Sequence, residues 1–146
     1  MASPIVLLAT SVPTPLVTAT LPVSEPPRFT PTPVCTPNLT FLSDLTIPDG
    51  TQVAPGATLD KRWQVENSGS CNWDANYRVK LIAGEQMGAP AEQALYPARS
   101  GTQATLRILF TAPTQPGTYR SAWQAFDPNG QPFGDVFFIE VVVVQP

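Results

Sequence analysis

The sequence contains no histidine, and only 13% of its 146 residues are charged. Without histidine, catalysis by Ser-His-Asp or Cys-His groups is excluded, and so is a metal site with histidine ligands. The low charge content argues against a coiled coil or a solvated helical bundle, which need many Glu and Lys side chains. The net charge of −3 argues against a nucleic-acid partner, because phosphate contacts require clustered Lys and Arg. No apolar run reaches the ~20 residues of a membrane span, so no transmembrane segment is expected.

Glycine is absent from residues 1–37, whereas nine of the 18 prolines lie there. The only charged residues of this segment are Glu25 and Arg28. Proline fixes φ and cannot donate to a β-ladder, so a Thr/Pro-rich segment favours an extended, disordered stalk over a packed fold. We therefore expect a low-complexity stalk at 1–37 and one folded domain at 38–146.

Short stretches with alternating apolar and polar residues fill the second part, separated by Gly/Pro turns. Between residues 57 and 66, the side chains of Leu59, Trp63 and Val65 share one face, as expected for a half-buried strand. Lys61 interrupts this face, and we expect its stem to reach the rim of the sheet. Further stretches that favour strands lie at 39–47, 77–84, 104–111 and 119–125.

The last stretch, residues 136–144, is apolar on both faces, which indicates a central or covered strand. Helical periodicity is missing between plausible helix caps. About seven strands with close turn signals predict an all-β fold, an immunoglobulin-like sandwich of two sheets. Tyr119, in the segment Pro-Gly-Thr-Tyr at the start of the penultimate strand, fits a tyrosine corner, whose hydroxyl bonds the backbone of the preceding loop. Ser121 stands where antibody domains have a cysteine, so their inter-sheet disulfide is absent.

The two cysteines, Cys35 and Cys71, lie at the end of the stalk and in the loop after the second long strand. An even cysteine number beside a stalk of this composition indicates an oxidising compartment and a Cys35–Cys71 disulfide. The alternative is a pair of free thiols in a cytosolic protein. A zinc site is excluded, because two cysteines without histidine supply too few ligands.

Several short motifs follow one another along the second part of the chain, and they contain Trp63, Asn67, Gly69, Gly117, Tyr119, Trp123, Phe133 and Gly134. The order of these motifs resembles the immunoglobulin-like four-tryptophan (FW) domain, known from selective-autophagy cargo receptors and exported bacterial proteins. The similarity runs from Leu39 to Val144, and the cysteine pair and stalk are similar to the bacterial exported members. Only three tryptophans are present, and Ala83 stands where a fourth often falls. The resemblance implies a non-catalytic interaction or accessory module.

Two loops are expected at one end of an immunoglobulin-type sandwich, at residues 68–76 and 127–134. Trp63 and Trp123 are expected in the core, whereas Trp73 either caps this end or is an exposed binding anchor. This end is the candidate binding surface. Its candidate residues are Ser70, Asn72, Trp73, Asn129 and Gln131.

The segment Asp-Pro-Asn-Gly at 127–130 superficially resembles the start of a calcium loop, but Phe138 occupies the position of the required acidic residue. We therefore interpret it as a hairpin turn. The other carboxylates alternate with apolar residues and are interpreted as solubilising charges, and neither a cofactor nor a metal is expected.

Three functions are compatible with these observations. The first is a protein-interaction or display module on an exported, cell-surface bacterial protein, with an unidentified protein partner. The second is a carbohydrate-binding sandwich, which needs exposed aromatic side chains and has only Trp73, Tyr77 and Tyr96 to supply them. The third, an enzyme, is not expected, because histidine and paired acids are missing.

Overall fold

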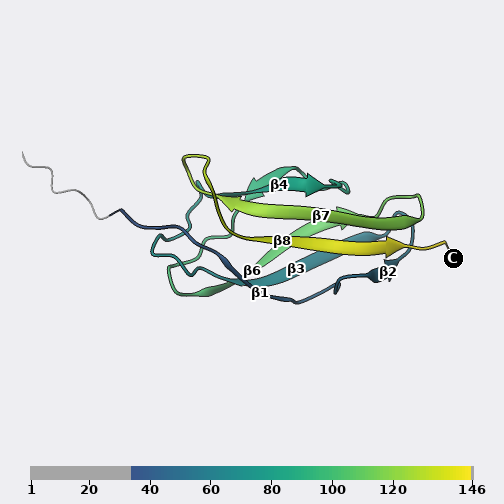
Figure 1. Ribbon diagram of the computed structural model, residues 1–146, viewed down its shortest axis with the longest axis horizontal. Helices are drawn as coiled ribbons and strands as arrows, with labels where there is room; N and C mark the ends of the chain where they lie inside the picture. Colours follow the sequence, from purple (N-terminus) through teal and green to yellow (C-terminus); the bar gives the residue numbers. More distant parts are fainter. Residues whose placement is uncertain (1–33, 146) are drawn as a thin grey trace, which may run out of the picture. The chain divides into compact units, whose positions relative to one another are not determined.

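The computed structural model describes residues 34–145, so most of the predicted stalk lies outside the described residues. This part of the chain consists of strands and loops (Figure 1). The strands are β1 (Thr40–Asp44), β2 (Thr51–Val53), β3 (Thr58–Glu66), β4 (Arg78–Gly84), β5 (Glu92–Ala94), β6 (Gln103–Thr111), β7 (Gly117–Phe126) and β8 (Pro132–Val143). None of residues 34–145 lies in a helix with the length and apolar character that crossing a membrane demands.

The strands form two stacked sheets (Figure 1). The first has the order β1-β3-β6 and the second the order β2-β8-β7-β4-β5. All pairs are antiparallel except β2 with β8. The predicted all-β, immunoglobulin-like sandwich is confirmed. The predicted number of about seven strands is close, and the two strands without a sequence signal, β2 and β5, are three residues each.

The core lies between the sheets and is built around Trp63 and Trp123, both completely buried. The Trp63 ring meets Phe137 edge-on with centroids 4.9 Å apart, and Phe110 meets Trp123 at 5.9 Å. Each indole N–H has an acceptor: Trp63 donates to the carbonyl of Phe138 at 2.9 Å, and Trp123 donates to the hydroxyl of Ser121 at 2.8 Å. Because rings of this size each bury roughly 200 Å², they are the main apolar contribution to the core.

β8 lies between β2 and β7, as its two apolar faces predicted. Its inward residues are buried, whereas its outward residues are only partly covered. The guanidinium carbon of Arg120 lies 3.6 Å from the ring centroid of Phe138 on the outer face, so a cation from β7 shields this aromatic ring.

The predicted tyrosine corner is present at the start of β7. The hydroxyl of Tyr119 donates to the backbone carbonyl of Gln115 at 2.8 Å, and its ring is half-buried against the core. The hydroxyl therefore satisfies a carbonyl of the loop that leads from β6 to β7. The predicted domain boundary between residues 37 and 38 stays a prediction.

Candidate functional site

The two loops of the candidate binding end lie together at one end of the sandwich (Figure 1). Side chains from both loops meet in the core: the ring centroids of Trp73 and Phe133 are 6.5 Å apart, and those of Tyr77 and Phe133 are 5.9 Å apart. Burial, together with the nearby carboxylates of Asp74 and Asp127, raises the pKa of the Tyr77 hydroxyl.

Trp73 caps this end of the core and is only 2% exposed. Its backbone pairs with that of Ala98 through two hydrogen bonds, with nitrogen-to-oxygen distances of 2.8 and 3.2 Å. The interpretation of Trp73 as an exposed binding anchor is therefore wrong. Its indole N–H has no hydrogen-bond acceptor among the residues that the structure describes. The remaining candidate side chains are exposed: Ser70, Asn72, Asn129 and Gln131.

Two of these exposed side chains stabilise the loops. The hydroxyl of Ser70 accepts the N–H of Thr36 at 2.8 Å, and Oδ1 of Asn72 accepts the N–H of Ser100 at 2.9 Å. Because both acceptors are occupied by backbone donors, these residues hold neighbouring segments in place.

The disulfide between Cys35 and Cys71 is present and joins the entering chain to the loop after β3. Beside it, the buried Asn67 side chain donates to the carbonyls of Cys71 at 2.9 Å and Ala98 at 3.0 Å. Gly69 lies against the backbone of Thr36, where a Cβ atom would overlap the carbonyl oxygen. Asn67 and Gly69 therefore have a structural role, because they hold the loop after β3 against neighbouring segments.

The segment after β7 is a hairpin turn, as predicted. One oxygen of the Asp127 carboxylate accepts the N–H groups of Asn129 and Gln131, both at 2.9 Å. The N–H of Gly130 also bonds the carbonyl of Asp127 at 2.9 Å. Within residues 34–145, acidic and cysteine side chains form no cluster suited to a metal ion.

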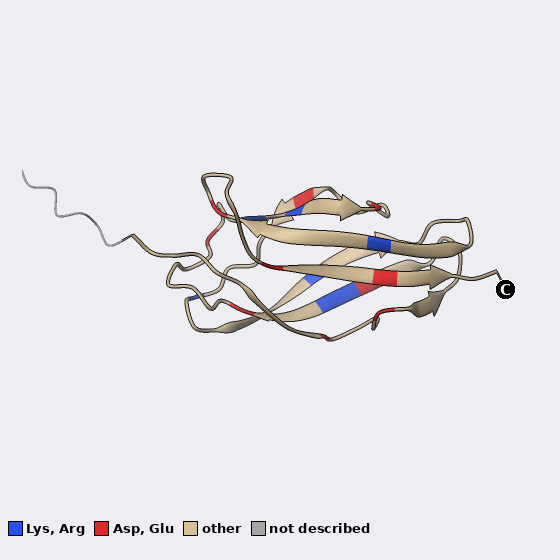
Figure 2. Ribbon diagram, viewed as in Figure 1, with Lys and Arg blue, Asp and Glu red and all other residues tan. Residues whose placement is uncertain are grey.

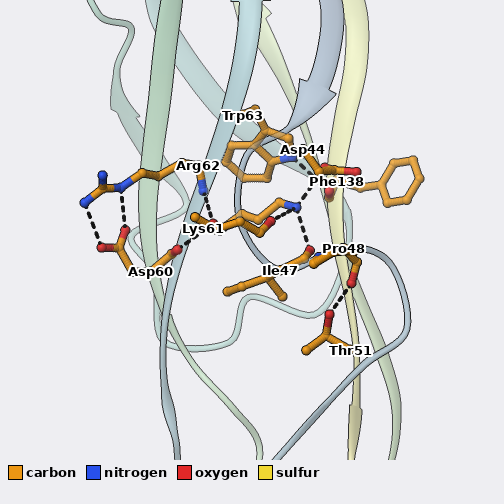
Figure 3. A network of polar contacts seen from close by, with 10 residues as sticks. Asp44, Ile47, Pro48, Thr51, Asp60, Lys61, Arg62, Trp63 and Phe138 are labelled. Atoms are coloured by element: carbon orange, nitrogen blue, oxygen red, sulfur yellow. Dashed lines mark hydrogen bonds and ion pairs between the residues drawn. The ribbon is translucent and has the colours of Figure 1, made fainter.

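A polar network centred on Lys61 was missed from the sequence (Figure 3). The Lys61 side chain is completely buried, so the expectation that it reaches the rim is wrong. Its ammonium group donates to Asp44 Oδ1 at 2.7 Å and to the carbonyls of Thr46 and Ile47, each at 2.8 Å. Three acceptors satisfy its three N–H donors, which is why a buried cation is tolerated here.

On the opposite face of β3, Asp60 lies between two arginines. Its carboxylate accepts bidentate bonds from Arg107 at 2.8 and 3.1 Å and from Arg62 at 3.4 and 3.1 Å. These bonds lower the pKa of Asp60 from its ordinary value of 3.8 to about 2, and those from Arg107 have the largest effect. The same pairing raises the pKa of Arg107. The charges elsewhere in the domain are distributed over both sheets (Figure 2).

A groove of about 460 Å³ lies beside Arg62 and Arg107. Tyr96 and Pro97, from the connection between β5 and β6, line it together with residues 103–105. Tyr96 is 60% exposed, whereas Tyr77 and Trp73 are buried. Of the three aromatic side chains proposed for carbohydrate binding, only Tyr96 is therefore accessible.

Comparisons with known proteins agree with this geometry. The family model described as "Ig-like domain from next to BRCA1 gene" matches residues 46–143. The chain is 33% identical to "Next to BRCA1 gene 1 protein" of Pongo abelii over 116 residues, covering 75% of this chain and 13% of that protein. It is 30% identical to "Protein NBR1 homolog" of Arabidopsis thaliana over 107 residues, covering 70% and 15%.

A third relative is "Protein ILRUN" of Danio rerio, which is 26% identical over 104 residues, covering 71% of this chain and 37% of that protein. The chain thus spans well under half the length of each of these relatives. The match starts after β1 and ends with β8, so it includes every strand of the two sheets except β1.

Proposed function

We propose, because this chain belongs to the family of Ig-like domains from next to BRCA1 gene, that its folded domain is a non-catalytic protein-interaction module. The observation that carries the proposal is the family match over residues 46–143. The domain's own features support a non-catalytic role. The three tryptophan rings are packed inside, and the carboxylates of Asp44, Asp60 and Asp127 are bound to cations or to backbone N–H groups.

We also propose that the chain belongs to an exported bacterial protein and displays the domain at the cell surface. The disulfide between Cys35 and Cys71 supports this location, because disulfides persist in oxidising compartments. The Thr/Pro-rich composition of residues 1–37 supports a spacer role, since proline-rich linkers are semi-rigid and extended.

Capture of a partner tests the interaction function. The full chain is immobilised and incubated with surface proteins of the source cells, and a Trp63→Ala variant, expected to unfold, serves as the control. A protein retained by the native chain in the presence of excess free sugars supports an interaction module. Retention that free sugars abolish assigns the carbohydrate alternative, and equal retention by both forms contradicts the proposal.

The location is tested by the oxidation state of the cysteines in the source cells. Free thiols are alkylated before lysis, and the peptides that contain Cys35 and Cys71 are then analysed by mass spectrometry. We expect both cysteines to escape alkylation, because the disulfide is already closed. Alkylation of both residues in intact cells would overturn export.

A further inference from the structure

The three-stranded sheet ends at β6, a strand of nine residues whose other edge carries no strand in the described part of the chain. In the constant-type immunoglobulin sandwich, the corresponding sheet has four strands. Here the chain instead forms β5 on the opposite sheet before it returns to β6. The edge of β6 is therefore an unfilled strand position, and long free edges are templates for strand addition.

The direction of the backbone groups on β6 follows from two hydrogen bonds at its end. The N–H of Ala112 donates to Ala57, the residue before β3, at 2.8 Å, and the N–H of Thr111 donates to Met87, on the other side, also at 2.8 Å. Backbone groups of neighbouring residues point to opposite sides of a strand. Those of Thr105, Arg107 and Leu109 therefore point away from β3, towards the free edge.

The side chains of these three residues are also exposed, with Leu109 at 50%. Met87 already provides one backbone acceptor on this side, at the end of the strand. A peptide that lay antiparallel along this edge, in line with Met87, would place one residue directly opposite Arg107. That residue and Arg107 would exchange backbone hydrogen bonds. The peptide's side chain there would lie on the same face as the Arg107 guanidinium, because directly opposed residues share a face.

The positive charge beside this edge favours a bound segment with an acidic side chain. Arg62 and Arg107 are among the residues that line the groove, and no acidic residue is. The two cations share one carboxylate, that of Asp60, so one positive charge remains uncompensated. A second copy of this chain paired symmetrically through Arg107 would place two guanidinium groups opposite each other, which is destabilising.

We propose that the free edge of β6 binds an extended segment of a partner protein as a fourth strand, with an acidic side chain opposite Arg107. This inference rests on the proposed function, and it names where the partner binds and what its segment contains. Backbone hydrogen bonds to Thr105, Arg107 and Leu109 supply the affinity, and the arginine pair supplies the preference for a carboxylate.

The probe is the capped peptide Ser-Leu-Thr-Glu-Thr-Thr-Ser, which in antiparallel pairing places Leu, Glu and Thr opposite Leu109, Arg107 and Thr105. Binding to the full chain is followed by the NMR shifts of the backbone amides. We expect the largest shifts at these three residues. N-methylation of the peptide's Glu, whose N–H faces β6, should weaken binding at least tenfold, whereas N-methylation of the preceding Thr should leave it unchanged.

Two variants test the edge from the side of the protein. Thr105→Pro removes an outward N–H without removing a bond to β3, and should abolish binding, whereas Thr105→Ala should bind like the native chain. In Arg107→Glu, which keeps all backbone groups, the Glu peptide should lose binding and a peptide with Lys in its place should regain it. The charge exchange remains informative if Thr105→Pro does not fold.

The outcomes separate this inference from the proposed function. Absence of peptide binding, equal effects of the two N-methylated peptides, or shifts confined to another surface would overturn strand addition at β6. A dimer of the native chain that Thr105→Pro disrupts would assign the edge to a second copy instead. After any of these outcomes, the proposed interaction function would still be supported if the native chain and the Thr105→Pro variant captured a partner protein equally well.

Discussion

The ammonium group of Lys61 lies 2.7 Å from the carboxylate of Asp44, on a strand face whose other members are the buried residues Leu59, Trp63 and Val65. Asp44 retains 25% exposure, so the pair joins the interior of the sandwich to its surface. The same ammonium group holds two carbonyls of the loop that follows β1. Lys61 therefore fixes the connection from β1 to β2.

Replacing this cation should be costly. We expect Lys61→Met to lower the free energy of unfolding by about 2–3 kcal/mol, because Asp44 and two carbonyls lose their donor. Arg62→Met is the matched control, since the same substitution on the exposed face of β3 should cost less than about 1 kcal/mol. Urea denaturation of both variants is the measurement, and equal stabilities would contradict a structural role for the buried ammonium.

The disulfide should stabilise the domain through the unfolded chain. With a separation of 36 residues, the loop-entropy relation gives about 4 kcal/mol for Cys35–Cys71. Cys71→Ser should therefore lower the melting temperature by at least several degrees. Addition of a reductant should shift the native chain by a similar amount and leave Cys71→Ser unchanged. A native melting curve that does not respond to reductant would contradict this prediction.

Gly134 and Gly130 allow backbone conformation and steric space to be separated. Both have positive φ, 76° and 81°, so alanine is strained at either position. A Cβ atom at Gly134 would also lie 2.6 Å from Cβ of Leu39, whereas Gly130 has open space around it. We expect Gly134→Ala to cost roughly 2 kcal/mol more than Gly130→Ala in thermal or urea unfolding. Equal losses would show that only φ matters.

The pairing of Asp60 with two arginines should make stability depend on pH. Its pKa is lowered from 3.8 to about 2 in the folded domain, so the folded state favours the ionised carboxylate. This contribution is present above the unfolded pKa and is lost as the pH falls from about 4 towards 2. The stability difference between the native chain and Asp60→Asn should therefore shrink over this range. NMR titration of the Asp60 carboxyl carbon checks the pKa directly, and a midpoint near 3.8 would contradict the pairing.

The sequence predicts the two-layer sandwich well, because alternation reports which face of a strand is buried. Trp63 and Trp123 each lie in a stretch of period two, and both are completely buried. The tyrosine corner and the turn at Asp127 are local, involving residues at most four apart, so their motifs suffice. The strands that were not predicted, β2 and β5, are too short to show any period.

Lys61 and Trp73 could not be placed from their neighbours. A lysine on an apolar face has the same pattern whether it reaches solvent or is buried, and the carbonyls that decide this lie 14 and 15 residues earlier in the chain. Trp73 lies in a loop between strands, where no alternation shows whether its side chain caps the core or is exposed. Its burial depends on Phe133, which is 60 positions away and is brought close only by the fold.

The position of Cys35 has a mechanical consequence for a domain held by its N-terminal segment. Tension applied along that segment passes through the sulfur–sulfur bond to Cys71 and bypasses residues 36–70, which include β1, β2 and β3. These strands cannot be peeled away by pulling from that side while the bond is closed. Reduction would release about 120 Å of additional chain length, since each residue extends at most ~3.5 Å.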